Sequence, residues 1–195
     1  MRIEILLFDG FDEIDALGPF EVLSGAFDVE LVTLNAPGPV TTSRGVQITT
    51  RSGLGRPDGV IVPGGGWLDH APEGSWAQAR RGHLPTALAD LASQLQWVAS
   101  VCTGSLLLAA AGLLTDRYAT TNRNAFAELR PHVRDVLDER VVQDGDRITA
   151  GGLTAGLDLG LWLIERHHGT AAADRAASGI EYQRQGRVWH APTRL

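Results

Sequence analysis

Apolar residues along the chain form short continuous runs that alternate with longer segments in which they recur every three or four positions. Residues 2–8, 59–62 and 97–101 are nearly continuous apolar runs, which are typical of strands buried on both faces of a sheet. Residues 28–34 alternate polar and apolar side chains as a further strand does, and residues 46–50 form a weaker strand pattern.

Helical spacing appears between these runs. Residues 13–23 predict a short helix with Ile14, Leu17 and Val22 facing the core, and Pro19 is expected to break it or restart a turn. Residues 75–95 predict a longer helix, divided or kinked at Pro85, and residues 106–113 and 154–165 predict two more.

Residues 140–143 and 147–150 flank Asp144-Gly145, a strong hairpin signal, whereas periodicity is lost near residues 184–187. Strands that alternate with helices predict a mostly parallel sheet covered on both faces. The fold class is therefore three-layer α/β, and the absence of linkers and repeats favours one domain over residues 1–195.

Composition narrows the chemistry. All 17 basic residues are arginines, which excludes a Schiff-base lysine, a lysine general base and a P-loop. The one cysteine, Cys102, excludes an intramolecular disulfide and multi-cysteine metal sites, and no His or carboxylate spacing predicts a metal. A lone thiol fits a reducing cytoplasm, where we expect this protein.

Charge and hydropathy limit the partners. The formal charge of −6 and the scattered arginines argue against nucleic acid. Acidic residues interrupt the N-terminal apolar run, so no signal peptide is expected, and no apolar stretch is long enough for a membrane span. A small molecule is the expected partner.

Cys102 lies at a predicted strand-to-helix junction and is followed by small residues. Ligands of open α/β sheets bind at the carboxyl ends of strands, and a helix N-terminus favours the thiolate, so we expect a nucleophile with a lowered pKa. The alternative is a small buried hydrophobic residue, as free cysteines usually are.

Two further segments end at the same edge of the sheet. The loop after the strand at 59–62 contains Gly64, Gly65 and Gly66, whose amides can stabilise developing negative charge, although a plain tight turn also explains them. Asp15 follows the first strand, where a buried carboxyl group could be protonated at neutral pH and donate its proton. A solvated cluster of acidic residues at the helix start is the alternative.

Taken in order, residues 15–22, 62–65, 101–105 and 142–152 resemble the ThiJ/PfpI superfamily, relatives of the class I glutamine amidotransferase domain. Cys-Thr-Gly-Ser at 102–105 and an Asp before Leu-Gly-Pro are most similar to its isonitrile hydratase branch. The resemblance implies a flavodoxin-like sandwich, a homodimer, and hydration of an isonitrile to an N-substituted formamide with no metal or cofactor.

Carried onto this sequence, the resemblance implies that Cys102 attacks the isonitrile carbon while Asp15 protonates it. Asp15 would then act as base when water hydrolyses the thioimidate. Thr103 would orient Asp15 through its hydroxyl or contribute its backbone amide.

The resemblance also implies that Gly65 belongs to an amide pocket. From the sequence we further expect Gly66 to supply an amide there and Trp67 and Asn122 to line the substrate pocket. Close relatives often have His followed by Trp where this chain has Asn122-Arg123, so a Cys–His dyad is not available at that position.

Other functions remain open. The same site suits a glyoxalase- or deglycase-like enzyme acting on α-ketoaldehydes, and a reactive thiol suits a redox sensor. Similar domains form the ligand-binding half of AraC-type regulators, so a non-catalytic small-molecule sensor is a further alternative, although too few residues follow Tyr182 for a helix-turn-helix unit. Asp158, on the apolar late helix, is expected to tie a neighbouring loop through hydrogen bonds.

Overall fold

The computed structural model describes residues 1–192 and is built around a β-sheet. From edge to edge its strands are β12 (Val188–His190), β10 (Val141–Asp144), β11 (Arg147–Ala150), β7 (Trp97–Val101), β6 (Gly59–Val62), β1 (Arg2–Leu7), β2 (Asp28–Thr33) and β5 (Ser52–Gly53). Neighbours from β11 to β5 are parallel, whereas β10 is antiparallel to β11 and parallel to β12. The predicted mostly parallel sheet is confirmed, and β6 and β7 are buried along their whole length.

Two small strand pairs lie outside this sheet. The weak strand predicted at 46–50 forms as β4 (Gln47–Thr49), but it pairs with β3 (Pro39–Thr41) rather than with the central sheet. The other pair is β8 (Tyr118–Ala119) with β9 (Asp135–Val136), neither of which the hydrophobic pattern predicted. Strands of two or three residues are too short to show periodicity.

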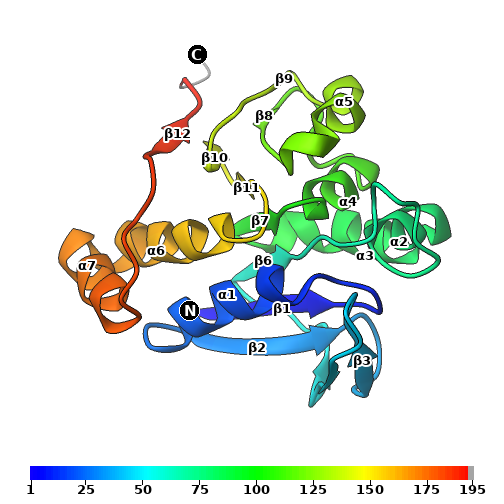
Figure 1. Cartoon of the computed structure of the whole chain (residues 1–195), viewed down its shortest axis with the longest axis horizontal. Helices are drawn as coiled ribbons and strands as arrows, with labels where there is room; N and C mark the ends of the chain where they lie inside the picture. Colours follow the sequence, from blue (N-terminus) through cyan, green and yellow to red (C-terminus); the bar gives the residue numbers. More distant parts are fainter. Residues whose placement is uncertain (193–195) are drawn as a thin grey trace.

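Helices form a layer on each side of the sheet. In one layer, helices α1 (Glu13–Ser24), α6 (Ala155–His168) and α7 (Thr170–Gly179) pack together. The other layer consists of α2 (Ser75–Arg81), α3 (His83–Leu91) and α4 (Gly104–Ala110). Figure 1 shows α6 and α7 on the left of the sheet and α2 and α3 on the right. The remaining helical segments are α5 (Phe126–Leu129) and three 3₁₀ turns, Ala92–Gln94, Arg123–Ala125 and Arg130–His132.

Helix α1 differs from its prediction in two respects. It continues through Pro19 without a break, and the face that packs inward carries Asp15, Ala16, Pro19, Val22 and Leu23. Ile14 and Leu17 are therefore 45% and 38% exposed, so their assignment to the core was wrong. Burying Asp15 turns these two side chains outward.

The predicted helix at 75–95 is divided, but at Gly82 rather than at Pro85. Gly82 is the capping residue between the end of α2 and the start of α3. Its φ is +77°, a conformation that suits glycine. Pro85 lies in the first turn of α3, where a missing N–H costs no helical hydrogen bond.

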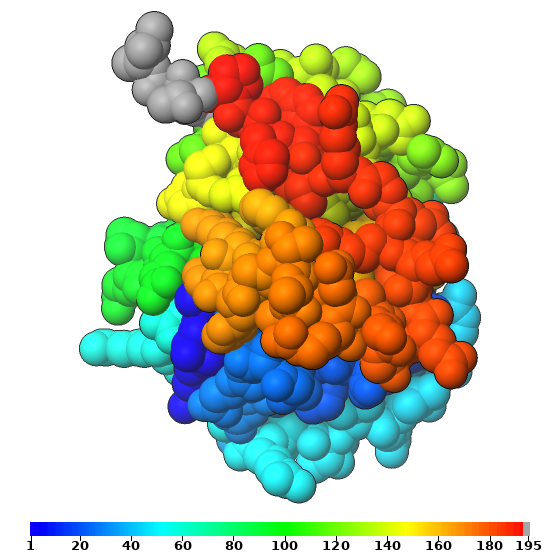
Figure 2. Space-filling model, turned by 90° about the vertical axis from the view of Figure 1, so that its left-hand side faces the viewer, coloured from blue at the N-terminus to red at the C-terminus, as the bar shows by residue number. Residues whose placement is uncertain are grey.

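The segment after α7 returns across the molecule to the sheet edge. Figure 2 shows it in red, lying above and beside α6 and α7 in orange. It ends in β12, which the sequence pattern did not predict. Asp158 of α6 holds this segment: it accepts hydrogen bonds from the Tyr182 hydroxyl at 3.0 Å, the Gln185 amide at 3.0 Å and Arg140 Nε at 2.6 Å.

The predicted structural role of Asp158 is thus confirmed, and substituting this residue tests how much its hydrogen bonds contribute to stability. Asp158→Ala is expected to lower the free energy of unfolding by about 3–5 kcal/mol, because it leaves the half-buried Arg140 without its carboxylate partner. The exposed pair Arg123–Asp138 is a matched control, and Asp138→Ala should cost less than about 1 kcal/mol. Urea denaturation measures both, and similar values for the two variants would contradict the assigned role.

Candidate active site

Cys102 lies between the end of β7 and the start of α4, in a backbone conformation that residues with a side chain rarely adopt. Its φ is +55°. The Cys102 amide donates to the carbonyls of Ala150 at 3.1 Å and Gly151 at 2.8 Å, and its carbonyl accepts from the Thr121 hydroxyl at 2.9 Å. Such strain persists only where its surroundings fix it, and it is common at reactive groups. This is the geometry of a nucleophile elbow.

Two glycines allow the glycine-rich loop to approach this elbow. A Cβ atom on Gly104 would lie 2.1 Å from the Val62 carbonyl oxygen, and one on Gly64 would lie 2.5 Å from the Thr103 amide nitrogen. Both contacts are with backbone and cannot be relieved by a side-chain rotation. Glycine at these positions therefore holds the loop against the first turn of α4.

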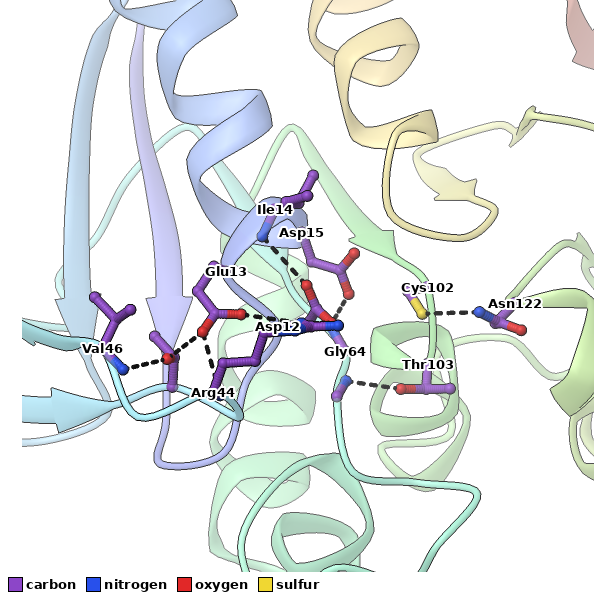
Figure 3. Close-up of polar contacts among 12 residues, drawn as sticks. Asp12, Glu13, Ile14, Asp15, Arg44, Val46, Gly64, Cys102, Thr103 and Asn122 are labelled. Atoms are coloured by element: carbon purple, nitrogen blue, oxygen red, sulfur yellow. Dashed lines mark hydrogen bonds and ion pairs between the residues drawn. The ribbon is translucent and has the colours of Figure 1, made fainter.

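Asp15 lies in the first turn of α1 and is fully buried. The Gly64 amide donates to Asp15 Oδ2 at 3.0 Å, whereas Oδ1 is buried with no N–H donor in residues 1–192. Figure 3 shows the carboxyl group facing the gap towards Cys102. Burial, with a smaller contribution from the negative charge of Asp12, raises the pKa of Asp15 to about 8, against the opposing Gly64 amide and Cys102 thiol. Asp15 is therefore a neutral acid at pH 7, as the sequence predicted for a buried carboxyl group.

The Cys102 thiol does not have the lowered pKa that its place at a helix start predicted. The residue is 6% exposed, and burial followed by the nearby Asp15 raises the pKa of the thiol to about 12. The Asn122 side chain and the amides of Thr103 and Leu153 oppose this shift. Desolvation outweighs the helix dipole here, so the resting thiol is protonated and a base must accept its proton when it reacts.

Thr103 does not orient Asp15 through its hydroxyl. Its Oγ1 accepts a hydrogen bond from the Gly65 amide at 3.0 Å and lies 3.1 Å from the hydroxyl of Ser75. The Thr103 hydroxyl therefore anchors the glycine-rich loop, and its backbone amide is the group that faces the sulfur. Because the Gly65 amide is occupied by Thr103, the prediction that it points to the substrate is wrong.

Gly66 and Trp67 are not among the residues that contact the Cys102 sulfur or line the cavity at Asn122 in the described residues. Gly66 lines a separate cavity that includes Asp9, Thr41 and Glu73. The Trp67 ring packs edge-on against Trp76, with 5.4 Å between ring centroids. Their place in the substrate pocket therefore stays a prediction.

Asn122 is placed beside the nucleophile, with its Nδ2 3.5 Å from Cys102 Sγ (Figure 3). It also lines a cavity of about 430 Å³, formed by residues 120–123, 138–140, 151–152, 155 and 185–186. Sequence reasoning missed two further residues at the elbow, because neither belongs to a recognisable motif. The Thr121 hydroxyl donates to the Cys102 carbonyl, and the Leu153 amide faces the Cys102 sulfur. Within residues 1–192, no cluster of three His, Cys, Asp or Glu side chains could hold a metal ion.

The raised pKa of Asp15 has a consequence for stability. The folded protein holds the Asp15 proton up to about pH 8, whereas the unfolded chain releases it near pH 3.8, the ordinary pKa of an aspartate. The stability that this group contributes is therefore fully present below about pH 3.8 and is lost as pH rises towards 8. Asp15→Asn should remove this loss, so that its melting temperature rises relative to that of the wild type from pH 5 to about pH 8 and the difference levels off above that. Parallel melting curves that do not diverge would show that the carboxyl group is not perturbed.

The sequence profile of the DJ-1/PfpI family matches residues 1–166. The chain belongs to the DJ-1/PfpI family. Its fold is the flavodoxin-like sandwich of that family, with Cys102 buried at the elbow position. In the described residues no helix is long and apolar enough to cross a membrane.

Three relatives show what this chain is similar to. It is 35% identical to the isonitrile hydratase of Pseudomonas putida over 187 residues, covering 93% of this chain and 78% of that protein. It is 30% identical to a ThiJ/PfpI family protein of Pseudomonas syringae, with a TM-score of 0.81 over 95% of this chain and 76% of that one. It is also 32% identical to the transcriptional regulator GbdR of Pseudomonas aeruginosa, covering 93% of this chain but 51% of the regulator. The family thus includes both enzymes and regulators.

Proposed function

We propose that this protein hydrates an isonitrile to an N-substituted formamide, with Cys102 as nucleophile and Asp15 as acid and base. The observation that carries the proposal is the buried, protonated Asp15 carboxyl group that faces the Cys102 thiol. The terminal carbon of an isonitrile needs a proton on carbon and a nucleophile on the same carbon, and this pair supplies both. The 35% identity to an isonitrile hydratase supports the same reaction.

In the first step, Asp15 gives its proton to the isonitrile carbon while the sulfur of Cys102 bonds to that carbon. The thiol proton passes to the Asp15 carboxylate, so the acid is regenerated. The product is a thioimidate in which an N=CH unit is bound to sulfur. Because the thiol has a high pKa, its deprotonation must accompany attack, and Asp15 is the nearby group that accepts the proton.

In the second step, water adds to the thioimidate carbon and a proton reaches nitrogen, giving a tetrahedral intermediate. Its collapse expels Cys102 sulfur, and the hydroxyl proton returns to the sulfur through Asp15. The Thr103 and Leu153 amides and Asn122 Nδ2 stabilise the departing thiolate, since each faces the sulfur. Water supplies the formamide oxygen, and no redox partner is needed.

Turnover of cyclohexyl isocyanide tests the proposal. Wild-type protein in ¹⁸O-labelled water should yield N-cyclohexylformamide that carries the label, detected by mass spectrometry. Heat-denatured protein is the control for spontaneous hydration. No formamide above that control, from protein that melts cooperatively, would reject the reaction.

Two features favour a non-catalytic small-molecule sensor as the second candidate. The resting thiol is neutral and 6% exposed, and the chain is 32% identical to a transcriptional regulator. A sensor would bind isonitriles or carbonyl compounds without consuming them. Isothermal titration that shows binding, together with unchanged ligand after long incubation, would favour this function over the hydratase.

A homodimer is part of the proposal. Ile14 and Leu17 are exposed apolar side chains on α1, next to Asp15 in sequence, and such residues suit a contact between subunits. A double substitution, Ile14→Glu with Leu17→Glu, should convert a dimer to a monomer in analytical ultracentrifugation. A wild type that sediments as a monomer at micromolar concentration would reject this part.

A further inference from the structure

The cavity beside Cys102 is unusual for its polar wall. Its volume of about 430 Å³ is within the range of small-molecule sites. The wall is formed by segments far apart in the sequence, at 120–123, 138–140, 151–152 and 185–186, and Ala155 is its one aliphatic side chain in the described residues. A cavity for a plain hydrocarbon would be lined by leucines, valines or aromatic rings.

This cavity shares its boundary with the nucleophile. Asn122 both contacts the Cys102 sulfur and lines the cavity, and Gly151, also in the wall, accepts the Cys102 amide hydrogen bond. An isonitrile is linear at nitrogen, so its substituent extends away from the carbon that the sulfur attacks. The cavity, which meets the elbow at Asn122 and Gly151, is the space where such a substituent can lie.

One polar group in the wall lacks a partner. Thr120 is 1% exposed, and its Oγ1 forms no hydrogen bond in residues 1–192, although its amide donates to Thr149 Oγ1 at 2.8 Å. Three of the charged side chains in the wall are paired, Arg123 with Asp138 at 2.6 Å and Arg140 with Asp158 at 2.6 Å, whereas Glu139 forms no ion pair in residues 1–192. A buried hydroxyl without a partner is unfavourable unless a bound molecule supplies one.

We propose that this cavity receives the nitrogen substituent of the substrate and selects substituents that form hydrogen bonds, such as those bearing a hydroxyl group, over hydrocarbon ones. The inference rests on the proposed hydratase function and adds a substrate class to it. A hydrocarbon group would strip water from the polar wall without replacing its hydrogen bonds. Sites built to bind a hydroxyl discriminate strongly against an analogue that lacks it.

The test uses two isonitriles of matched shape, cyclohexyl isocyanide and trans-4-hydroxycyclohexyl isocyanide. Wild-type kcat/KM should be at least about tenfold higher for the hydroxylated compound. Thr120→Val, which keeps the side-chain shape, should reduce this ratio towards one. Arg123→Leu, a change at an exposed residue in the cavity wall, should also reduce it and is a second test should the first variant fail to fold.

Ser100→Ala is the matched control, because Ser100 has an equally buried hydroxyl without a partner in the described residues but does not line the cavity. It should leave the ratio unchanged. Equal or slower turnover of the hydroxylated compound, with cyclohexyl isocyanide still hydrated, would overturn the inference and leave the hydratase function intact. A wild type that hydrates neither compound would overturn the function itself, and the inference with it.

Discussion

Cys102→Ala is expected to lower the rate of formamide formation by about 10⁴-fold or more, the loss typical of removing a nucleophile that forms the covalent intermediate. The variant removes the sulfur and leaves the elbow hydrogen bonds of the Cys102 amide and carbonyl in place. The measurement is kcat/KM for cyclohexyl isocyanide at pH 7, with product followed by mass spectrometry.

Cys102→Ser is the companion variant. It keeps the size of the side chain but offers a hydroxyl, whose deprotonation is harder than that of a thiol, so it should be nearly as inactive. Both variants should melt within a few degrees of the wild type, since they keep the backbone and fill most of the same volume. Activity retained within about tenfold by Cys102→Ala would remove the sulfur from the chemistry.

Asp15→Asn is expected to lower kcat/KM by about 10²–10⁴-fold, the usual contribution of a general acid or base. The amide fills the same space and still accepts the Gly64 N–H, but it cannot give a proton to the isonitrile carbon or accept one from the thiol. The loss should fall mainly on kcat, because proton transfer occurs in the transition state.

The pH profile separates this role from a structural one. Wild-type activity should fall as pH rises through about 8, because Asp15 then loses the proton that the first step needs. The residual activity of Asp15→Asn should lack this fall. Asp12→Asn is the control, since Asp12 raises the pKa of Asp15 by its charge, and its removal should move the fall to lower pH. A wild-type profile that is flat from pH 6 to pH 9 would contradict a proton-donating Asp15.

The layered fold could be predicted from the sequence because its central strands carry strong signals. Residues 59–62 and 97–101 are apolar throughout, and buried parallel strands require that pattern. The edge of the sheet could not be predicted in the same way. Strand β12 is three residues long and partly exposed, and its pairing with β10 depends on the anchor that Asp158 provides to the preceding segment.

The sequence predicted that Cys102 and Asp15 lie at one candidate site, but not the pKa of the thiol or the hydrogen bonds around it. Cys102 directly follows β7 and Asp15 lies in the first turn of α1, the helix that follows β1, and strand order explains why their side chains meet at one edge of the sheet. The local rule that a helix start lowers a thiol pKa failed, since burial and the nearby carboxyl group have the larger effect. Hydrogen bonds such as that from the Gly65 amide to Thr103 depend on tertiary packing that no sequence motif encodes.

The most direct test of covalent catalysis by Cys102 is the intact mass of the protein during a single turnover, quenched in acid on a millisecond time course. A thioimidate forms by addition, so covalent catalysis requires a transient species heavier by the whole mass of the isonitrile, located on the Cys102 peptide. It should appear before formamide and decay as formamide accumulates. Formamide released from an enzyme whose Cys102 peptide stays unmodified throughout the first turnover would contradict the account.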